Sequence, residues 1–284
     1  ILSYHFFEEG TMALITISRQ LGSLGSEIAN KLKSELNYRF LDKESLEKTL
    51  SEYGIDEEYV EKCDEKKPGF WESIALDKDR YLHFVKKAIL EFSLNGSGII
   101  LGRGGQLILK GLPATLHIRF VAPLDHRVSR VSSIYNCDTS HAVKIIRQSD
   151  SDRAGFHKYF FYSDWDAVEH YDIVFNTMAY SEKTMIKTIR TIIESDEFLV
   201  HEAAAKKNLK DLCLGQEVLT RILYREKISV QFIEAIADDG TITLRGTTIA
   251  GGDIKKCDDI AAETPGVKTV KNEISFIPIS YGMT

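Results

Sequence analysis

The residues whose types and spacing best suit chemistry lie in one stretch near the N-terminus, Ser18-Arg-Gln-Leu-Gly-Ser-Leu-Gly-Ser26. A glycine-rich loop can point several backbone N–H groups at one anion, and a helix that follows adds its positive N-terminal end. The candidate phosphate contacts are Ser18, Gly22, Ser23, Gly25 and Ser26. The Ser26 hydroxyl is also the candidate contact for a Mg²⁺ ion carried by that phosphate. A tight strand-to-helix turn that binds nothing is the alternative interpretation.

This loop departs from the regular Walker A pattern G-x-x-x-x-G-K-[S/T], whose lysine neutralises phosphate charge. Gly25 stands at the lysine position, and Arg19 and Leu24 stand at the two glycine positions, so that only Ser26 is retained. A guanidinium group stays charged and can grip phosphate with two hydrogen bonds. Arg19 is therefore the expected local substitute for the lysine and a candidate catalytic residue.

Five short apolar runs predict the strands that position this loop, at residues 13–17, 38–41, 98–101, 115–121 and 172–175. Helical patterns lie between them, including residues 26–36 and a highly charged segment over 43–95. Strands that alternate with helices predict an α/β fold, a parallel sheet with helices on both faces.

Polar residues follow these strands at the positions where each one ends, namely Asp42, Arg103 and Asn176 in addition to the loop that follows the first strand. Ligands of parallel sheets bind beyond the carboxyl ends of the strands. The coincidence predicts one binding site along that edge of the sheet.

Six segments in this order resemble the cytidylate kinase-like family of nucleoside monophosphate kinases. The segments are Ile15-Thr-Ile-Ser-Arg-Gln-Leu-Gly-Ser-Leu-Gly-Ser-Glu-Ile-Ala29, Tyr38-Arg-Phe-Leu-Asp-Lys43, Gly98-Ile-Ile-Leu-Gly-Arg-Gly104, Val121-Ala-Pro-Leu-Asp-His-Arg-Val-Ser-Arg130, Arg147-Gln-Ser-Asp-Ser-Asp-Arg153 and Tyr171-Asp-Ile-Val-Phe-Asn-Thr177. The resemblance covers roughly residues 13–193. It implies a P-loop kinase-like fold and transfer of the ATP γ-phosphoryl group, with Mg²⁺, to a nucleoside monophosphate such as CMP.

The resemblance also implies roles for individual residues. Arg147 and Arg153 would close from a lid over the transferring phosphoryl group, and Asp42, Lys48 and Arg103 would hold the acceptor nucleotide. Without the resemblance, a solvated helix face is the preferred interpretation of the arginines near the lid, Arg127, Arg130, Arg147 and Arg153.

Two departures from the family pattern support a rival hypothesis. The Walker lysine is missing, and Gly104 stands where cytidylate kinases carry the aspartate of a G-R-D segment. A catalytically degenerate domain that senses a nucleotide would tolerate both changes. Phosphoryl transfer is the leading hypothesis, and nucleotide sensing is the alternative from a different functional class.

The C-terminal part predicts a separate module. We expect a kinase-like domain over 12–195, a helical linker over 196–211 and an αββαβ module over 212–278. Asp239-Gly-Thr-Ile-Thr-Leu-Arg-Gly-Thr247 and Pro265-Gly-Val-Lys-Thr-Val-Lys-Asn-Glu-Ile274 resemble the BON domain family. That resemblance implies binding of a lipid surface, a small ligand or a protein partner, and assembly of a homo-oligomer stays open as a further role.

Composition excludes several classes of protein. The 36 Lys and Arg against 42 Asp and Glu give a net charge of −6, which disfavours a nucleic-acid polymer as partner. No apolar run approaches the roughly 20 residues of a membrane-spanning helix. Four widely separated cysteines and no basic signal-peptide segment in residues 1–11 predict free thiols and a cytoplasmic location. Met12 directly precedes the first strand, and whether residues 1–11 are native stays open.

Overall fold

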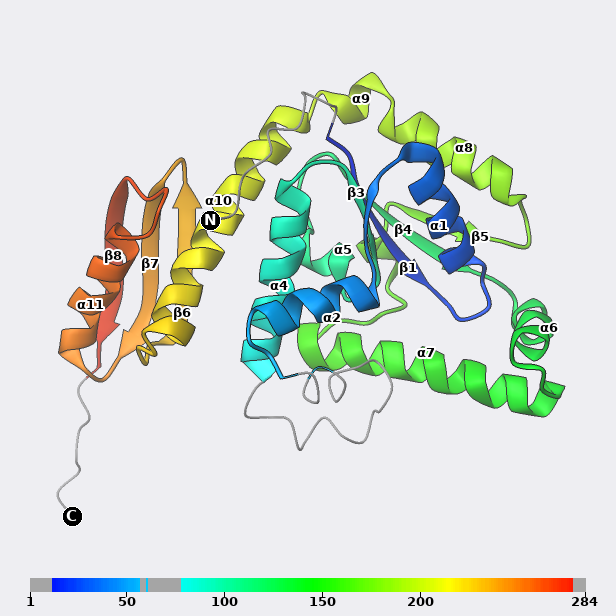
Figure 1. Ribbon diagram of the computed structural model, residues 1–284, viewed down its shortest axis with the longest axis horizontal. Helices are drawn as coiled ribbons and strands as arrows, with labels where there is room; N and C mark the ends of the chain where they lie inside the picture. The colour runs from blue at the N-terminus through cyan, green and yellow to red at the C-terminus, as the bar shows by residue number, and fades with distance from the viewer. Residues whose placement is uncertain (1–11, 57–59, 61–77, 278–284) are drawn as a thin grey trace, which may run out of the picture. The chain divides into compact units, whose positions relative to one another are not determined.

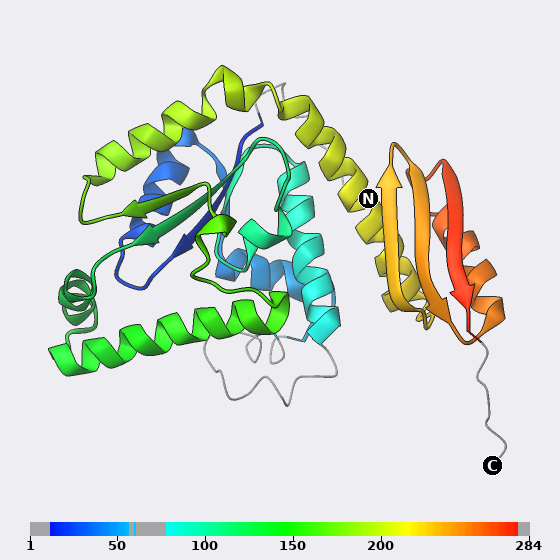
Figure 2. The same cartoon turned by 180° about the vertical axis from the view of Figure 1, so that it is seen from behind.

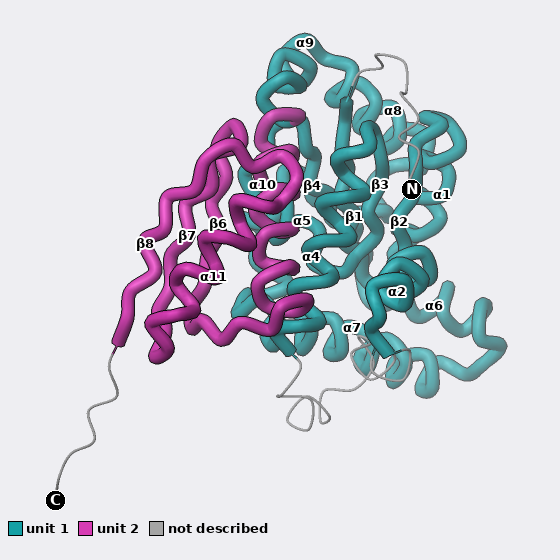
Figure 3. The backbone as a smooth tube through the Cα atoms, turned by 60° about the vertical axis from the view of Figure 1, so that its left-hand side comes forward, with its two compact units in different colours: residues 1–205 teal, residues 206–284 magenta. Residues whose placement is uncertain are grey.

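The computed structural model describes residues 12–56, 60 and 78–277. The chain forms two compact units, Ile1–Ala205 and Lys206–Thr284 (Figure 3). The division falls within helix α10 (Glu202–Thr220), and the short helix α9 (Asp196–Leu199) precedes it. Three parts of the sequence predictions lie outside the described residues. They are residues 1–11, residues 57–59 and 61–77 of the charged segment expected to be helical, and residue 278 at the end of the expected C-terminal module.

The larger unit is built on a parallel sheet of five strands in the order β2-β3-β1-β4-β5. The strands are β1 (Leu14–Arg19), β2 (Arg39–Leu41), β3 (Gly98–Leu101), β4 (Thr115–Val121) and β5 (Ile173–Asn176). The central strand β1 (Figure 1) is buried from Leu14 to Ser18, as its apolar and β-branched run predicts, and its last residue, Arg19, is half-buried. The expected α/β fold class is confirmed, and each predicted strand lies within two residues of an observed one.

Helices cover both faces of this sheet (Figures 1 and 2). On one face, α1 (Gly25–Leu36) and α8 (Glu182–Ile193) bury their apolar sides against Ile15, Ile17 and Phe120. On the other face, α5 (Gly105–Ile108) begins against the side chains of Thr16 and Ile100, and α4 (Lys78–Leu94) packs beside it. Because side chains alternate along a strand, β1 supplies both cores.

Three further helices frame the carboxyl edge of the sheet: α2 (Lys43–Glu52), α6 (Leu124–Tyr135) and α7 (Thr139–Phe161). Helix α7 is anchored at its C-terminal end by the buried rings of Phe156 and Phe160, with Trp165 buried just beyond the helix. These three rings therefore fix the end of α7 in the core of the larger unit. Tyr162, at the end of α7, is 87% exposed.

The smaller unit has a three-stranded sheet in the order β6-β7-β8. Its elements are the C-terminal part of α10, a π-helical turn (Arg221–Arg225), β6 (Gln231–Asp238), β7 (Thr241–Thr248), α11 (Gly251–Ala262) and β8 (Thr269–Phe276). Strands β6 and β7 are antiparallel and β7 and β8 are parallel. Positive φ angles at Asp239 (46°) and Gly240 (84°) make the tight turn that joins β6 to β7. The αββαβ order is thus confirmed.

The described part of the chain also bears on the cysteine and membrane expectations. None of its helices is long and apolar enough to cross a membrane. Cys137, Cys213 and Cys257 are free thiols, and burial raises the pKa of the Cys257 thiol to about 11. Cys63 lies outside the described residues.

A single methyl group at Gly215 is expected to destabilise the smaller unit. A Cβ at this position would lie 2.4 Å from the carbonyl oxygen of Ala235, which belongs to the sheet and cannot rotate away. Overpacking of this kind typically costs about 1–3 kcal/mol, more than the about 1 kcal/mol that alanine gains over glycine in a helix. Urea unfolding of Gly215→Ala should show a lower midpoint than the parent chain.

Gly252→Ala is the matched control for this change, because a Cβ there would meet nothing within 4 Å. Its unfolding midpoint is expected to equal or exceed that of the parent chain. Equal stability of the two variants would contradict the packing of α10 on β6.

Candidate active site

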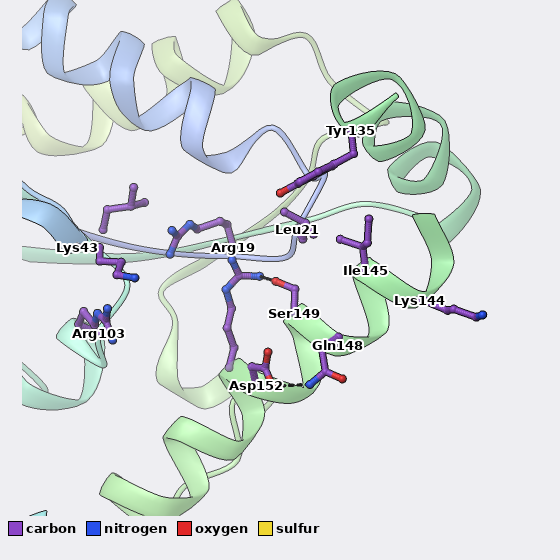
Figure 4. A pocket seen from close by; sticks show the side chains of 12 residues that line it. Arg19, Leu21, Lys43, Arg103, Tyr135, Lys144, Ile145, Gln148, Ser149 and Asp152 are labelled. Carbon is purple, nitrogen blue, oxygen red and sulfur yellow. Dashed lines mark hydrogen bonds between the residues drawn. The ribbon is translucent and has the colours of Figure 1, made fainter. Parts of the chain in front are cut away.

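A cavity of about 640 Å³ lies beyond the carboxyl ends of β1 and β3. Its walls come from the loop after β1, the first residue of α2, the turn before α5, the last residue of α6 and one face of α7. The lining residues are Arg19, Leu21, Lys43, Leu101, Arg103, Tyr135, Lys144, Ile145, Gln148, Ser149, Asp152 and Arg153. Figure 4 shows Arg19 between Lys43 and Arg103 on one side and Ile145 and Tyr135 on the other. The predicted edge of the sheet therefore does carry a cavity.

The loop after β1 is held in shape by the protein itself. Gly22 has a φ of 77°, and a Cβ there would lie 3.0 Å from the carbonyl oxygen of Arg127 on α6. Arg130 of the same helix donates a hydrogen bond to the Gly22 carbonyl oxygen over 3.0 Å. The first hydrogen bond of α1 is donated by Ile28 to Leu24, so the amides of residues 25–27 precede the helical ladder. These amides are the group that an anion would contact.

Gly25 and Arg19 are packed against each other. A Cβ at Gly25 would lie 2.5 Å from the Cβ of Arg19 and 3.0 Å from the Cβ of Phe120. No side chain fits at this position, which explains physically why the loop lacks the Walker lysine. Arg19 extends across the start of α1, where its Nε donates to Ser26 Oγ over 3.4 Å, and it lines the cavity. The guanidinium group thus stands beside the hydroxyl that a regular Walker loop also carries.

Two of the predicted phosphate contacts have hydroxyl groups that serve the fold. Ser18 is 4% exposed and accepts hydrogen bonds from Trp165 Nε1 (2.9 Å) and from the Tyr171 hydroxyl (3.3 Å). Ser23 is fully buried and donates to the Gln20 carbonyl oxygen over 2.8 Å. In this arrangement, these residues shape the loop through their side chains.

Helix α7 brings only one of its two predicted lid arginines to the cavity. Arg153 lines the cavity and donates to Ser149 Oγ over 2.8 Å. Arg147 is exposed and lies outside the lining. The residues of α7 that line the cavity recur at the spacing of one helix face, and Arg147 lies about 200° around the helix from Ser149. The pitch of the helix therefore separates the two arginines.

Helix α7 is tied to α6 by a buried ion pair. Arg127 is 5% exposed, and both of its terminal nitrogens donate to Asp150 Oδ2 over 2.7 Å. Arg130 donates a hydrogen bond to Gly22 in the loop after β1, as described above. These two arginines hold the loop, α6 and α7 together, which excludes for them the alternative of a solvated helix face.

The predicted acceptor residues are spread around the second strand and its helix. Asp42 caps α2 and accepts hydrogen bonds from the backbone N–H (2.9 Å) and the hydroxyl (2.6 Å) of Ser45. Burial opposes ionisation of Asp42, but these hydrogen bonds outweigh it and lower the pKa of its carboxyl group. Lys48 is exposed and outside the lining, whereas Lys43 lines the cavity.

Arg103 reaches the cavity from a strained turn after β3. Arg103 has a φ of 54° and is 5% exposed. Its Nη2 lies 3.5 Å from Glu47 Oε1, within ion-pair distance. A Cβ at the next residue, Gly104, would lie 2.4 Å from the ring of Phe161. An aspartate at this position, which cytidylate kinases carry, would require the Phe161 ring to move and would hold a φ of 70°.

Sequence reasoning missed several lining residues, chiefly Lys43, Asp152, Leu21 and Tyr135. Lys43 directly follows Asp42, so the rule about carboxyl ends of strands could have found it. Asp152 is 4% exposed, accepts from Gln148 Nε2 over 2.7 Å and shares its helix face with Arg153. Tyr135 carried no signal, because the distance between α6 and the loop is set only by the fold.

Three known proteins illustrate what this chain is similar to. A uronate isomerase of Corynebacterium glutamicum is 36% identical over 87 residues, which are 30% of this chain and 16% of that protein. An uncharacterized protein of Eubacterium ventriosum has a crystal structure with a TM-score of 0.51 and 22% identity, over 64% of this chain and 99% of that one. A shikimate kinase of Bacteroides thetaiotaomicron has a TM-score of 0.39 and 16% identity, over 65% of this chain and 99% of that one.

The Eubacterium structure bears on the fold alone, and the uronate isomerase likeness spans about a sixth of that protein. The family comparison covers more of the chain. The model of the cytidylate kinase-like family matches residues 14–179, which include all five strands of the parallel sheet and every residue that lines the cavity. The chain belongs to the cytidylate kinase-like family.

Proposed function

We propose that this protein transfers the γ-phosphoryl group of ATP to a nucleoside monophosphate, with CMP as the first acceptor to test. The observation that carries the proposal is the arrangement of Arg19, Lys43, Arg103 and Arg153 around one cavity beside the glycine loop. Two phosphate-bearing substrates bring several negative charges together, and four cationic side chains from four different segments match that demand.

The chemistry needs positioning and charge neutralisation. A phosphate oxygen of the acceptor attacks the γ-phosphorus, the bond from that phosphorus to the bridging oxygen breaks, and ADP leaves with the electron pair. Arg19 would neutralise the donor phosphates from within the loop, and Arg153 would stabilise the transferring group from α7. Arg103 and Lys43 would hold the acceptor phosphate at the other end of the cavity.

A Mg²⁺ ion fits this site as a partner of the nucleotide. Among the described residues, no group of three or more His, Cys, Asp or Glu side chains is arranged to hold a metal ion. Mg²⁺ in kinases keeps several waters and binds through substrate phosphates with one or two protein oxygens. Ser26 Oγ, at the start of α1, would supply one such oxygen, and the ion would offset phosphate charge.

The direct test is a coupled assay of ADP release with Mg²⁺-ATP and each of the common ribo- and deoxyribonucleoside monophosphates. Release above the rate of ATP hydrolysis without acceptor is the expected result, highest for CMP or a close relative. Failure of every acceptor, with ATP bound, would overturn the proposal.

That negative result would favour the second candidate, a nucleotide sensor without transferase activity. The tight contact between Gly25 and Arg19 is the observation behind it, because it leaves no space for the Walker lysine. Calorimetric titration with ATP in the absence of an acceptor measures binding independently of turnover and separates the two candidates.

Arg153→Ala is expected to lower turnover much more than Arg147→Ala, although both lie in the same helix. Loss of a single charged phosphate contact typically costs about a hundredfold in rate. Arg153 lines the cavity, whereas the exposed Arg147 lies outside its lining. Steady-state rates of the two variants, with circular dichroism as a check on folding, test this contrast. Equal loss in both variants would show that α7 rotates or shifts during the reaction.

We further propose that the smaller unit is a BON-like binding module. Its αββαβ order and the turn sequences around Asp239 and Gly266 support this assignment. A role in assembly is tested by light scattering of the full chain and of a chain that ends at residue 205. An equal number of copies in both assemblies would remove oligomerisation as its function.

A further inference from the structure

The two ends of the cavity differ in chemistry. One end carries the cations Lys43 and Arg103, and Arg19 lies between the two ends. The other end carries the apolar side chains of Leu21 and Ile145 with the ring of Tyr135, and the Lys144 side chain beside them points outward (Figure 4). A nucleotide has the same division, because its phosphates are anionic and its base is a flat and largely apolar ring. The lining of the cavity is therefore divided in the same way as a nucleotide.

The apolar end is held rigidly by the packing of α6 against α7. Leu21 and Ile145 both pack on a hydrophobic cluster of these helices, which consists of Val128, Val131, Ala142 and Ile146. This cluster connects the loop after β1 to the wall of the cavity. Its members are 0–8% exposed, so the positions of Leu21 and Ile145 are determined by a close-packed core.

Tyr135 completes this end from the last residue of α6. Its side chain is 54% exposed although it lines the cavity, so its ring remains largely available to a ligand. A half-exposed aromatic ring gains contact area when a flat partner covers it, and stacking between an aromatic side chain and a base favours binding by about tenfold or more. The amphipathic ring thus suits a base at the mouth of the cavity.

We propose that Leu21, Ile145 and Tyr135 form the binding site for the base of the donor nucleotide, with the base stacked on Tyr135. Leu21 belongs to the loop that would hold the donor phosphates, so the nucleotide runs from Tyr135 through the loop to Arg19. The acceptor then occupies the end that carries Lys43 and Arg103. This inference rests on the proposed function, because it assumes that the cavity takes ATP.

The test compares ATP with inorganic tripolyphosphate, which has the phosphates and lacks the base. Calorimetric titration of the full chain should show about tenfold or greater loss of ATP affinity in Tyr135→Ala, with tripolyphosphate affinity unchanged. Tyr135→Phe keeps the ring and is expected to bind ATP as the parent chain does. Because the side chain is on the surface, these variants should keep the stability of the parent chain.

Tyr180→Ala is the matched control, because Tyr180 is 61% exposed in the same unit and lies outside the cavity lining. It should bind ATP with unchanged affinity. Loss of affinity in Tyr180→Ala and not in Tyr135→Ala would overturn the proposed base site while leaving nucleotide binding intact. Equal affinity of Tyr135→Ala and the parent chain would overturn it as well. Absence of ATP binding to the parent chain would instead refute the proposed function on which the site rests.

Discussion

Arg19→Ala is expected to lower the rate of phosphoryl transfer by about a hundredfold or more while the protein stays folded. The reason is electrostatic, since the proposed function has Arg19 neutralise the donor phosphates in place of the absent lysine, and removal of one such donor typically costs 10²–10³ in rate, on the order of 3 kcal/mol. Its side chain lines the cavity and is partly exposed, so truncation should leave the buried core intact. Steady-state ADP release at saturating substrates measures the effect.

Arg19→Lys serves as the conservative variant and should recover part of the rate, because the charge is retained and the two-pronged geometry is lost. Arg147→Ala removes an exposed arginine that lies outside the cavity lining and controls for the change in net charge. Unchanged turnover in Arg19→Ala would remove Arg19 from the site. A large drop in thermal stability of that variant would show a structural role.

Gly25→Lys restores the Walker lysine in sequence, yet it is expected to destabilise the protein and to abolish nucleotide binding. The first atom of the new side chain would lie 2.5 Å from the Cβ of Arg19 and 3.0 Å from that of Phe120. Both contacts are to atoms attached directly to the backbone of neighbouring strands, so neither can rotate away. Overpacking of a core costs about 1–3 kcal/mol and occasionally more. Urea unfolding and calorimetric titration with ATP measure the two effects.

Gly25→Ala separates the steric effect from the charge. It should reproduce most of the loss of stability, because the Cβ atom alone makes the contact. Gly252→Lys places the same residue at an exposed glycine whose Cβ would meet nothing within 4 Å, and it should be tolerated. A stable Gly25→Lys variant with turnover above that of the parent chain would contradict the structure of the loop.

The sequence alone predicted the fold class and the elements of both units. The apolar runs at residues 13–17 and 98–101 are short, buried and β-branched, and they form adjacent strands of the sheet. The αββαβ order of the smaller unit followed from strand patterns and from the Asp239-Gly240 turn. These features depend on local periodicity and turn chemistry, which a single sequence records directly.

The candidate site could be predicted only in part. Positions after strands and within a motif predicted the edge of the sheet and the glycine loop. They also predicted Arg19, Arg103 and Arg153, and all three line the cavity. Lys48 and Arg147 were expected beside them, and the structure places both at the surface, outside the cavity lining. Each is one of several cations in a helix, and proximity in sequence does not state which face of the helix meets the cavity.

The sequence by itself therefore determined which strands form and at which edge of the sheet the cavity lies. Only the tertiary structure decided which side chains meet there. The rotation of α7 places Arg153 in the lining, the contact between Gly25 and Arg19 excludes a lysine, and the ring of Phe161 lies where a side chain at Gly104 would begin. The physical reason is that secondary structure arises from neighbours along the chain, whereas a binding site is made by close packing between segments far apart in sequence.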